Sequence, residues 1–448
     1  MNNAKRMTKG KIALVACLGA VALVTLGLIG AKLASPEGKK PSGRLFVDPT
    51  FHYEALRVLG YSSTGGADIN EVLHTVAKIP QGDNEAWARE WYATGERVER
   101  LANTYSDPAS ASFAMGRASN YYRAAEFFMQ AKDPRKIDIS RKTVSAFRKH
   151  LDMGGVVYRE FQVPYGDSSL DAVYYPAKDP GDRPLIVCVD GYDSIKEELY
   201  FLGAKACLER GYSVVTFDGP GQGTAIREKG IKMTPDWIVP MRSLLDEFTA
   251  RFGAPSRVVL LGNSFGSILS LRAAAFEPRI AGVACFDIFY DYAEVAYGDF
   301  PENLKAQIDG KKPMSERAIA LSDSVILSDW FRAISPKIAW AMKQGMFIFG
   351  VKGPFEVLRE YRKYTIVDIA DRVKCDVLLL AGTEDHLIPY RLLEPHRKAL
   401  TNARSVTVHS YDRESGGQEH CQVGANSLWQ ADFFDWLAER FGEAGGIE

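Results

Sequence analysis

The sequence predicts an α/β fold with a mostly parallel central sheet and helices on both faces. Two observations lead to this prediction. From about residue 154 onward, short continuous apolar runs alternate with helical segments, which is typical of strands buried on both faces of a parallel sheet. Before about residue 151, apolar residues such as Trp87, Trp91 and Val98 recur near helical spacing instead. This aromatic pattern is explained better by helix packing than by a ligand site, so a helical N-terminal domain is expected.

Eight apolar runs are the expected strands. The first two are joined by a polar turn at Gly166, Asp167 and Ser168, and the other six are separated mainly by helical segments. The expected strands span residues 156–163, 170–175, 185–189, 212–217, 258–261, 280–286, 377–380 and 405–408.

The chain of 448 residues exceeds one ordinary domain, and we expect it to divide into four parts. An apolar N-terminal segment covers residues 1–34, and a linker rich in Lys, Pro and Gly covers 35–47. The helical domain follows at 48–153, and the catalytic domain takes 154–448. No clear strand interrupts about 292–368, so a helical cap is expected there.

Composition limits the class of function. The formal net charge of -1 and the lack of a basic stripe argue against nucleic-acid binding. The six cysteines form no CxxC pair or Cys/His cluster with the spacing of metal ligands. We therefore expect neither a metal site nor a disulfide scaffold, which favours a reducing compartment for the soluble part.

The N-terminal segment has the composition of a membrane helix. Lys5, Arg6, Lys9 and Lys11 precede an uncharged apolar run at residues 12–31, about the 20 residues needed to cross a bilayer. The positions before plausible cleavage points lack small residues, so a single uncleaved membrane anchor is expected. The alternative is a secreted or periplasmic protein after cleavage. Basic residues on both sides of the run leave the membrane orientation open.

The strongest motif follows the expected strand at 258–261. The sequence Gly262-Asn263-Ser264-Phe265-Gly266 is a G-x-S-x-G motif between that strand and a helical segment. This context separates the nucleophile elbow of the α/β-hydrolase fold from an ordinary glycine-rich turn. The tight turn lifts the Ser264 hydroxyl off the sheet edge, and the helix N-terminus favours a developing oxyanion. We therefore predict that Ser264 is the nucleophile.

A serine hydroxyl needs an adjacent base, and histidine suits that role near neutral pH. In this fold the acid follows a later strand, and the histidine lies in a loop beyond the last strand. Asp385 and His420 occupy those two places. Glu384 is a weaker acid candidate because the aspartate lies in the usual G-x-x-D pattern. His386 and His409 are expected to be structural.

The second oxyanion donor is expected in the loop after the strand at 185–189. The backbone N–H groups of Phe265 and Tyr192 are the candidate donors, and Gly191 allows the substrate to approach closely. The glycine-rich turn at 218–223 lacks the Gly-Lys-Ser/Thr ending of a phosphate loop, and so a structural turn is expected there.

Several of these segments together resemble one branch of the α/β-hydrolases. They are 190–194 with Glu197 and Glu198, the turn at 218–223, the elbow at 262–266, and Glu419-His420-Cys421. The branch contains 2,6-dihydroxypseudooxynicotine hydrolase and fungal hydrolases that shorten polyketide naphthopyrones.

The resemblance spans about residues 87–437 and implies a helical N-terminal domain that closes over a triad. It implies that Ser264, Asp385 and His420 match that triad, and that the segment from Asp291 to Glu294 carries an extra carboxylate facing the substrate. Some members of the branch cleave carbon–carbon bonds of β-dicarbonyl or acyl-phenol compounds.

We therefore expect a serine hydrolase that forms an acyl-enzyme on a small, apolar or aromatic carbonyl substrate, without a cofactor. Three alternatives stay open: a carboxylesterase, an acyl-peptidase, or a non-catalytic binding protein on the same fold. The sequence leaves a homo-oligomer open as well.

Overall fold

The computed structural model describes residues 43–442. Its centre is an eight-stranded sheet in the order β1-β2-β4-β3-β5-β6-β7-β8. Strands β3 to β8 are mutually parallel, whereas β1 and β2 pair antiparallel with their neighbours. This architecture confirms the predicted α/β-hydrolase fold. The strands are β1 Arg159–Tyr165, β2 Ser168–Tyr175, β3 Leu185–Val189, β4 Val214–Phe217, β5 Val258–Asn263, β6 Ile280–Phe286, β7 Asp376–Gly382 and β8 Ser405–Tyr411.

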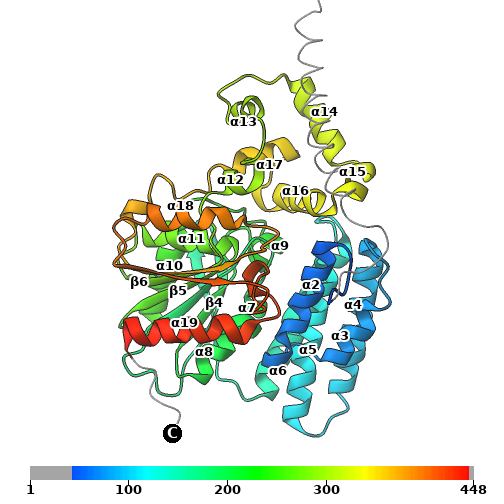
Figure 1. Ribbon diagram of the computed structural model, residues 1–448. Coiled ribbons are helices and arrows are strands. Elements are labelled where there is room, and N and C mark those ends of the chain that lie inside the picture. Colours follow the sequence, from blue (N-terminus) through cyan, green and yellow to red (C-terminus); the bar gives the residue numbers. More distant parts are fainter. Residues whose placement is uncertain (1–42, 443–448) are drawn as a thin grey trace, which may run out of the picture.

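The strands of the sheet centre are apolar throughout because both faces are covered. In β5, Val258 and Leu260 face one hydrophobic core, and Val259 and Leu261 face the other. Helices α10 and α11 pack on the first face and α19 packs on the second (Figure 1). The helices around the sheet are α7 Lys196–Leu199, α8 Lys205–Glu209, α9 Gly223–Arg227, α10 Ile238–Phe252, α11 Phe265–Ala274, α18 Leu393–Ala399 and α19 Asn426–Phe441, with a π-helical turn η2 at Tyr200–Ala204.

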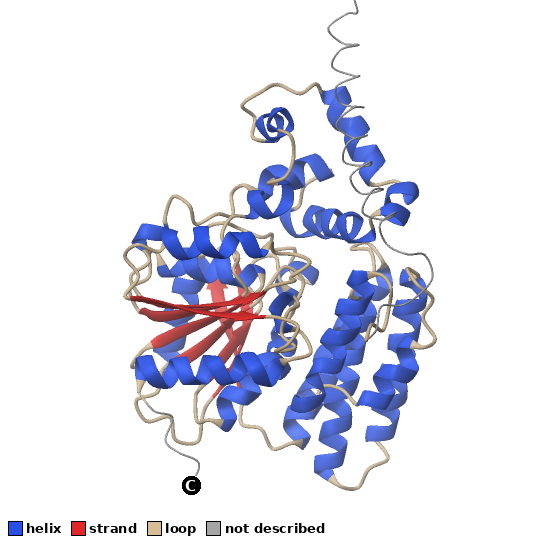
Figure 2. Ribbon diagram, in the orientation of Figure 1, coloured by secondary structure: helices blue, strands red, loops and turns tan. Residues whose placement is uncertain are grey.

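The N-terminal region is helical, as predicted, and lies beside the sheet (Figure 2). Each of its five α-helices begins after an aspartate whose carboxylate accepts hydrogen bonds from N–H groups of the first turn. In three of them a proline follows the aspartate, where its fixed φ suits the first helical position. The helices are α2 Pro49–Gly60, α3 Ile69–Val76, α4 Asn84–Ala102, α5 Pro108–Glu126 and α6 Pro134–Met153.

The aromatic residues of this region form its core. Trp87 and Trp91 are completely buried, and the Trp87 indole N–H donates to the carbonyl of Ala124 at 2.8 Å. Gly95 of α4 faces the ring of Tyr122, where an added Cβ would lie only 2.8 Å from ring carbons. Packing between α4 and α5 therefore explains the aromatic pattern.

The expected cap is a series of helices between β6 and β7, above the sheet in Figure 1. Helix α16 joins the parts of the molecule. Its Trp340 stacks on Phe127 of the N-terminal region at 4.8 Å between ring centroids, and its Lys337 donates to the carbonyl of His386. The cap helices are α12 Tyr292–Tyr297, α13 Glu302–Ile308, α14 Glu316–Ile326, α15 Asp329–Ile334, α16 Pro336–Phe349 and α17 Pro354–Tyr361.

The residues that the structure describes contradict the expectation of a membrane-anchored protein, which is therefore wrong. Between residues 43 and 442, no helix combines the length and the apolarity that a bilayer crossing demands. The long helices there, such as α4 and α6, carry many charged residues and pack by one face. The apolar run at 12–31, on which the expectation depended, lies outside the described residues.

Candidate active site

Ser264 lies at the sharp turn between β5 and α11. Its backbone has φ 53° and ψ −117°, a conformation that L-residues rarely adopt and that is held here by the surrounding fold. The Ser264 N–H donates to the carbonyl of Phe286 at 2.6 Å. A Cβ at Gly266 would clash with the carbonyl oxygens of Val189 and Asp190. The elbow thus needs glycine because two backbone segments meet there.

Three predicted residues form one hydrogen-bonded line. The Ser264 Oγ lies 2.7 Å from Nε2 of His420, and Nδ1 of His420 lies 2.6 Å from Oδ2 of Asp385. The side chains of His420 and Asp385 are almost completely buried. The other carboxylate oxygen of Asp385 accepts from the backbone N–H groups of Leu387 and Ile388. The carboxylate is therefore held by its own loop as it faces the imidazole.

A second carboxylate, which the sequence did not single out, contacts the same imidazole nitrogen. Oδ2 of Asp287 lies 3.1 Å from Nδ1 of His420, and its side chain is completely buried. Asp287 follows directly after β6, and its Oδ1 accepts from the N–H of Ile288 at 2.6 Å. Its Oδ2 also accepts from the N–H of Cys421 at 3.2 Å. Two carboxylates and one imidazole therefore share a single buried site.

This cluster shifts the titration of its members. Burial raises the pKa of Asp385 to about 7, and the neighbouring Asp287 carboxylate adds to the rise. Burial would lower the pKa of His420, but the Asp385 carboxylate reverses this and raises it well above its usual range. Burial would likewise raise the pKa of Asp287, but hydrogen bonds with His420 and Asp385 lower it.

The two candidate oxyanion donors are the backbone N–H groups of Phe265 and Tyr192. Among the described residues, neither the Phe265 N–H nor the Tyr192 N–H donates a hydrogen bond. The N–H of Gly191 is engaged by Oδ1 of Asp190 at 3.0 Å, so it is not a donor to a substrate. A Cβ at Gly191 would lie 3.5 Å from the Ser264 Cβ, which shows how closely this loop approaches the elbow.

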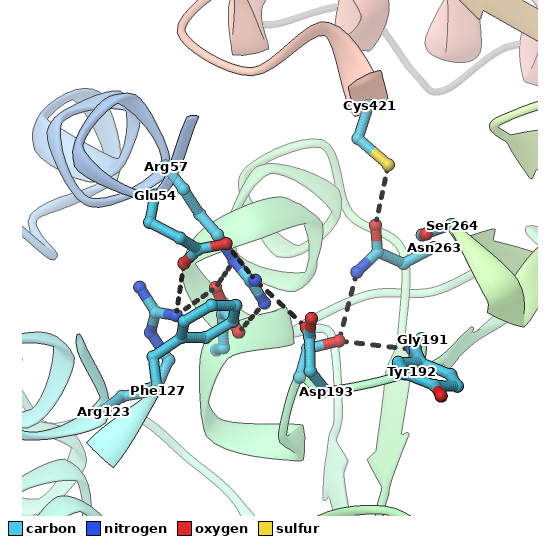
Figure 3. A network of polar contacts seen from close by, with 12 residues as sticks. Glu54, Arg57, Arg123, Phe127, Gly191, Tyr192, Asp193, Asn263, Ser264 and Cys421 are labelled. Atoms are coloured by element: carbon cyan, nitrogen blue, oxygen red, sulfur yellow. Dashed lines mark hydrogen bonds and ion pairs between the residues drawn. The ribbon is translucent and has the colours of Figure 1, made fainter. Parts of the chain in front are cut away.

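A chain of hydrogen bonds connects the loop that carries His420 to the loop at residues 190–194, which we call the oxyanion loop (Figure 3). The connection runs through the elbow. The Cys421 thiol donates to Oδ1 of Asn263 at 3.4 Å, and the Asn263 amide donates to the Ser194 hydroxyl at 3.3 Å. The Gly191 N–H lies 3.2 Å from the same hydroxyl oxygen. Asn263 therefore connects the loops that carry His420 and Tyr192.

A buried ionic cluster joins α2 to the same oxyanion loop (Figure 3). Arg57 donates to both carboxylate oxygens of Glu198 and to Asp193, at 2.6, 2.7 and 3.1 Å. Glu54 lies 3.2 Å from Arg57 and 3.7 Å from Arg123. Burial raises the pKa of Glu54 to about 7. The cluster fixes the residue after Tyr192 to the N-terminal region.

Aromatic and basic groups border the imidazole from other elements. The Tyr53 ring of α2 lies 5.8 Å from the His420 ring, and the His386 ring lies 6.5 Å from it. Burial lowers the pKa of His386 well below its usual range, and burial also lowers the pKa of Lys337. The N-terminal region and the cap thus both reach the site.

In the segment from Asp291 to Glu294, the Tyr292 ring packs 5.1 Å from the Phe265 ring, but the two carboxylates make their contacts elsewhere. The Asp291 carboxylate caps α12 by accepting from the N–H of Ala293 at 2.9 Å. Glu294 is exposed and lies 3.5 Å from Arg391. None of these contacts involves Ser264 or His420.

One group of potential metal ligands occurs in the described residues. Asp287, His420 and Cys421 bring their ligand atoms within 4.8 Å of one another. Both nitrogens of His420 already face Ser264 and Asp385, and the Cys421 thiol donates to backbone and amide oxygens. These donors are arranged for hydrogen bonds with one another rather than toward a common metal centre.

Comparisons with known proteins match this chain to hydrolases. A model of the alpha/beta hydrolase family matches residues 191–420, and a model described as Esterase FrsA-like matches residues 45–291. Hydrolase acrC of Aspergillus aculeatus is 31% identical over 425 residues, which cover 87% of this chain and 96% of the relative. The 20-hydroxy-prefusarin hydrolase FUS2 of Gibberella moniliformis is 32% identical over 421 residues, covering 89% and 98%.

The fold is also that of a solved enzyme. The crystal structure of 2,6-dihydroxy-pseudo-oxynicotine hydrolase superimposes with a TM-score of 0.65 at 18% sequence identity, over 86% of this chain and 95% of that one. The predicted resemblance is therefore confirmed, as is the prediction of a hydrolase. The chain belongs to the alpha/beta hydrolase family.

Proposed function

We propose that this hydrolase is a serine hydrolase with Ser264 as nucleophile, His420 as general base and Asp385 as the carboxylate that orients the base. The observation that carries the proposal is the line of two hydrogen bonds, 2.7 Å from Ser264 to His420 and 2.6 Å from His420 to Asp385. A hydroxyl bonded to an imidazole whose other nitrogen faces a carboxylate is the arrangement that activates serine for acyl transfer.

The proposed reaction has two halves. Ser264 Oγ attacks a carbonyl carbon while its proton passes to Nε2 of His420, and the N–H groups of Phe265 and Tyr192 stabilise the oxyanion. The bond to the leaving group then breaks, and that group takes the proton from Nε2. Water attacks the resulting acyl-enzyme with His420 again accepting a proton, which releases the acid and restores Ser264.

We propose a small apolar or aromatic carbonyl compound as the substrate, with an enol or other carbon acid as the leaving group. The rings of Tyr53 and His386 beside His420 support an aromatic ligand. Two relatives are named for hydrolysis of 20-hydroxy-prefusarin and 2,6-dihydroxy-pseudo-oxynicotine. An ester substrate is the second candidate, because the Esterase FrsA-like model matches residues 45–291.

Labelling with a fluorophosphonate tests the nucleophile. We expect the full chain to acquire one adduct, and Ser264→Ala to acquire none. Ser270→Ala is the matched control, since Ser270 is buried in the same helix α11 and has no hydrogen-bond partner among the described residues. Labelling of Ser264→Ala at the wild-type rate would refute the assignment.

Parallel assays with aryl β-diketones, p-nitrophenyl esters and aminoacyl amides test the leaving group. We expect turnover of a β-diketone to exceed that of the matched ester and amide. The Ser264→Ala variant should lose about four or more orders of magnitude in kcat. Turnover of esters alone would favour the second candidate, and turnover of amides alone would point to a peptidase.

A further inference from the structure

The Asp287 carboxylate lies within hydrogen-bond distance of the His420 imidazole. Its Oδ2 lies 3.1 Å from Nδ1 of His420, only slightly farther than Oδ2 of Asp385 at 2.6 Å. All three side chains are at most 2% exposed. A buried carboxylate beside another carboxylate is unfavourable unless its surroundings compensate for it, and so its presence requires an explanation.

The backbone fixes Asp287 in this position. Oδ1 accepts from its neighbour Ile288, and Oδ2 accepts from the N–H of Cys421, the residue that follows the base. Asp287 directly follows β6, whereas Asp385 belongs to the loop after β7. The imidazole is thus held between two adjacent strand ends of the sheet.

We propose that Asp287 is a second positioning residue for His420, so that the imidazolium formed during acyl transfer is stabilised by two carboxylates rather than one. This inference rests on the proposed serine mechanism. The single hydrogen on Nδ1 remains there throughout and is shared between the two facing oxygens. The proton from Ser264 resides on Nε2, as before.

The two carboxylates differ in the pH range over which they carry a negative charge. Burial and the Asp287 charge raise the pKa of Asp385, so Asp385 takes up a proton at higher pH than an ordinary aspartate does. Burial would also raise the pKa of Asp287, but hydrogen bonds with His420 and Asp385 lower it, so Asp287 stays ionised to lower pH. Asp287 therefore supplies negative charge to the imidazolium when Asp385 holds a proton.

Other titratable groups also face this cluster, and each must be left unchanged in the test. They are Tyr53 of α2, Cys285 of β6, Lys337 of α16, His396 of α18, His386 and Glu419 of the neighbouring loops, and Cys421.

The rate of fluorophosphonate labelling, measured from pH 5 to 9, tests the inference without a known substrate. We expect Asp287→Asn to slow labelling about 10-fold and Asp385→Asn about 100-fold, with the double variant as slow as His420→Ala. Removal of the Asp287 charge lowers the pKa of both Asp385 and His420, because that neighbour raised both. The imidazole must be neutral for the base to act, so the acid limb of the profile should move to lower pH.

Asp376→Asn is the matched control. Asp376 is a buried aspartate that pairs with Arg404 at the other end of β7, so its loss destabilises the sheet without touching the base. The acid limb of the labelling profile of Asp376→Asn should stay at the same pH as in the wild type. Should Asp287→Asn fail to fold, Asp385→Asn alone decides, since the inference requires it to label faster than His420→Ala.

The outcomes are distinguishable. An unshifted acid limb in folded Asp287→Asn, or equal rates for Asp385→Asn and His420→Ala, would overturn the role of Asp287 while the serine mechanism stands. Failure of the wild-type chain to label would overturn the serine mechanism itself.

Discussion

The guanidinium of Arg57 binds the carboxylate of Glu198 through two hydrogen bonds, with Nε and Nη2 donating to its two oxygens at 2.6 and 2.7 Å. Arg57 belongs to the N-terminal helix α2, whereas Glu198 belongs to the short helix that follows the oxyanion loop. The same guanidinium reaches Asp193, the residue after the candidate donor Tyr192. One buried side chain therefore joins the helical region to the site.

Replacement of Arg57 by Ala should strongly lower both the stability and the activity of the protein. It leaves Glu198 and Glu54 buried without their main partner, and loss of one partner of a buried ion pair costs about 3–5 kcal/mol of unfolding free energy. The oxyanion loop should also loosen, which lowers kcat more than it raises KM. Urea unfolding and steady-state kinetics measure the two effects.

The control for this prediction is Arg135→Ala. Arg135 also pairs with two carboxylates, Glu85 and Asp133, but its side chain is 50% exposed. Surface pairs of this kind contribute less than about 1 kcal/mol. Equal losses of stability in the two variants would contradict the importance of the buried cluster.

The elbow should not tolerate a single methyl group. Gly266→Ala places a Cβ in collision with the Val189 carbonyl oxygen, and backbone cannot yield as a side chain does. We expect a loss of about 3 kcal/mol of stability together with loss of labelling at Ser264. In the control Gly203→Ala the Cβ meets only the ends of the Leu261 and Trp429 side chains, and the change should stay within about 1 kcal/mol. Calorimetric melting compares the two.

Acid should destabilise the fold through His396, which is completely buried beside Tyr290. Burial lowers the pKa of His396 to about 4 from 6.5. As the pH falls through 6.5 the unfolded chain binds a proton that the folded chain does not, so stability is lost between about pH 6.5 and 4. At pH 5 this loss is about 2 kcal/mol relative to pH 7.

His396→Leu should therefore lose about 2 kcal/mol less stability than the wild type between pH 7 and pH 5, as measured by urea unfolding. The exposed His74 of α3 offers the control His74→Gln, whose pH dependence should match the wild type. A His396→Leu curve parallel to the wild-type curve would show that other groups cause the acid sensitivity.

Most strands could be predicted because they are short, nearly continuous apolar runs, whereas the segments between them mix apolar and polar residues. Their order in the sheet could not, since β4 lies outside β3 although it follows it in the chain. Continuous apolarity shows that both faces are covered, but it does not show which strand is the neighbour.

The contact between Asp287 and His420 could not be predicted from the sequence, because other aspartates occupy equivalent positions. Asp190, Asp218 and Asp287 each follow directly after a strand, and the sequence gives no means to separate them. In the structure Asp190 bonds to Ser194 and Asp218 bonds to Lys196, whereas Asp287 alone of the three contacts His420. The ion pair between Arg57 and Glu198 could not be predicted either, because Glu198 lies 141 residues farther along the chain.

His420 follows Ser264 by 156 residues of chain. During synthesis the elbow therefore leaves the ribosome well before β8, His420 and helix α19, which together complete one face of the sheet. A growing chain that holds Ser264 alone has an unactivated hydroxyl. By the proposed mechanism, reactivity toward carbonyl compounds begins only when folding is almost finished, and an incomplete chain lacks an activated nucleophile.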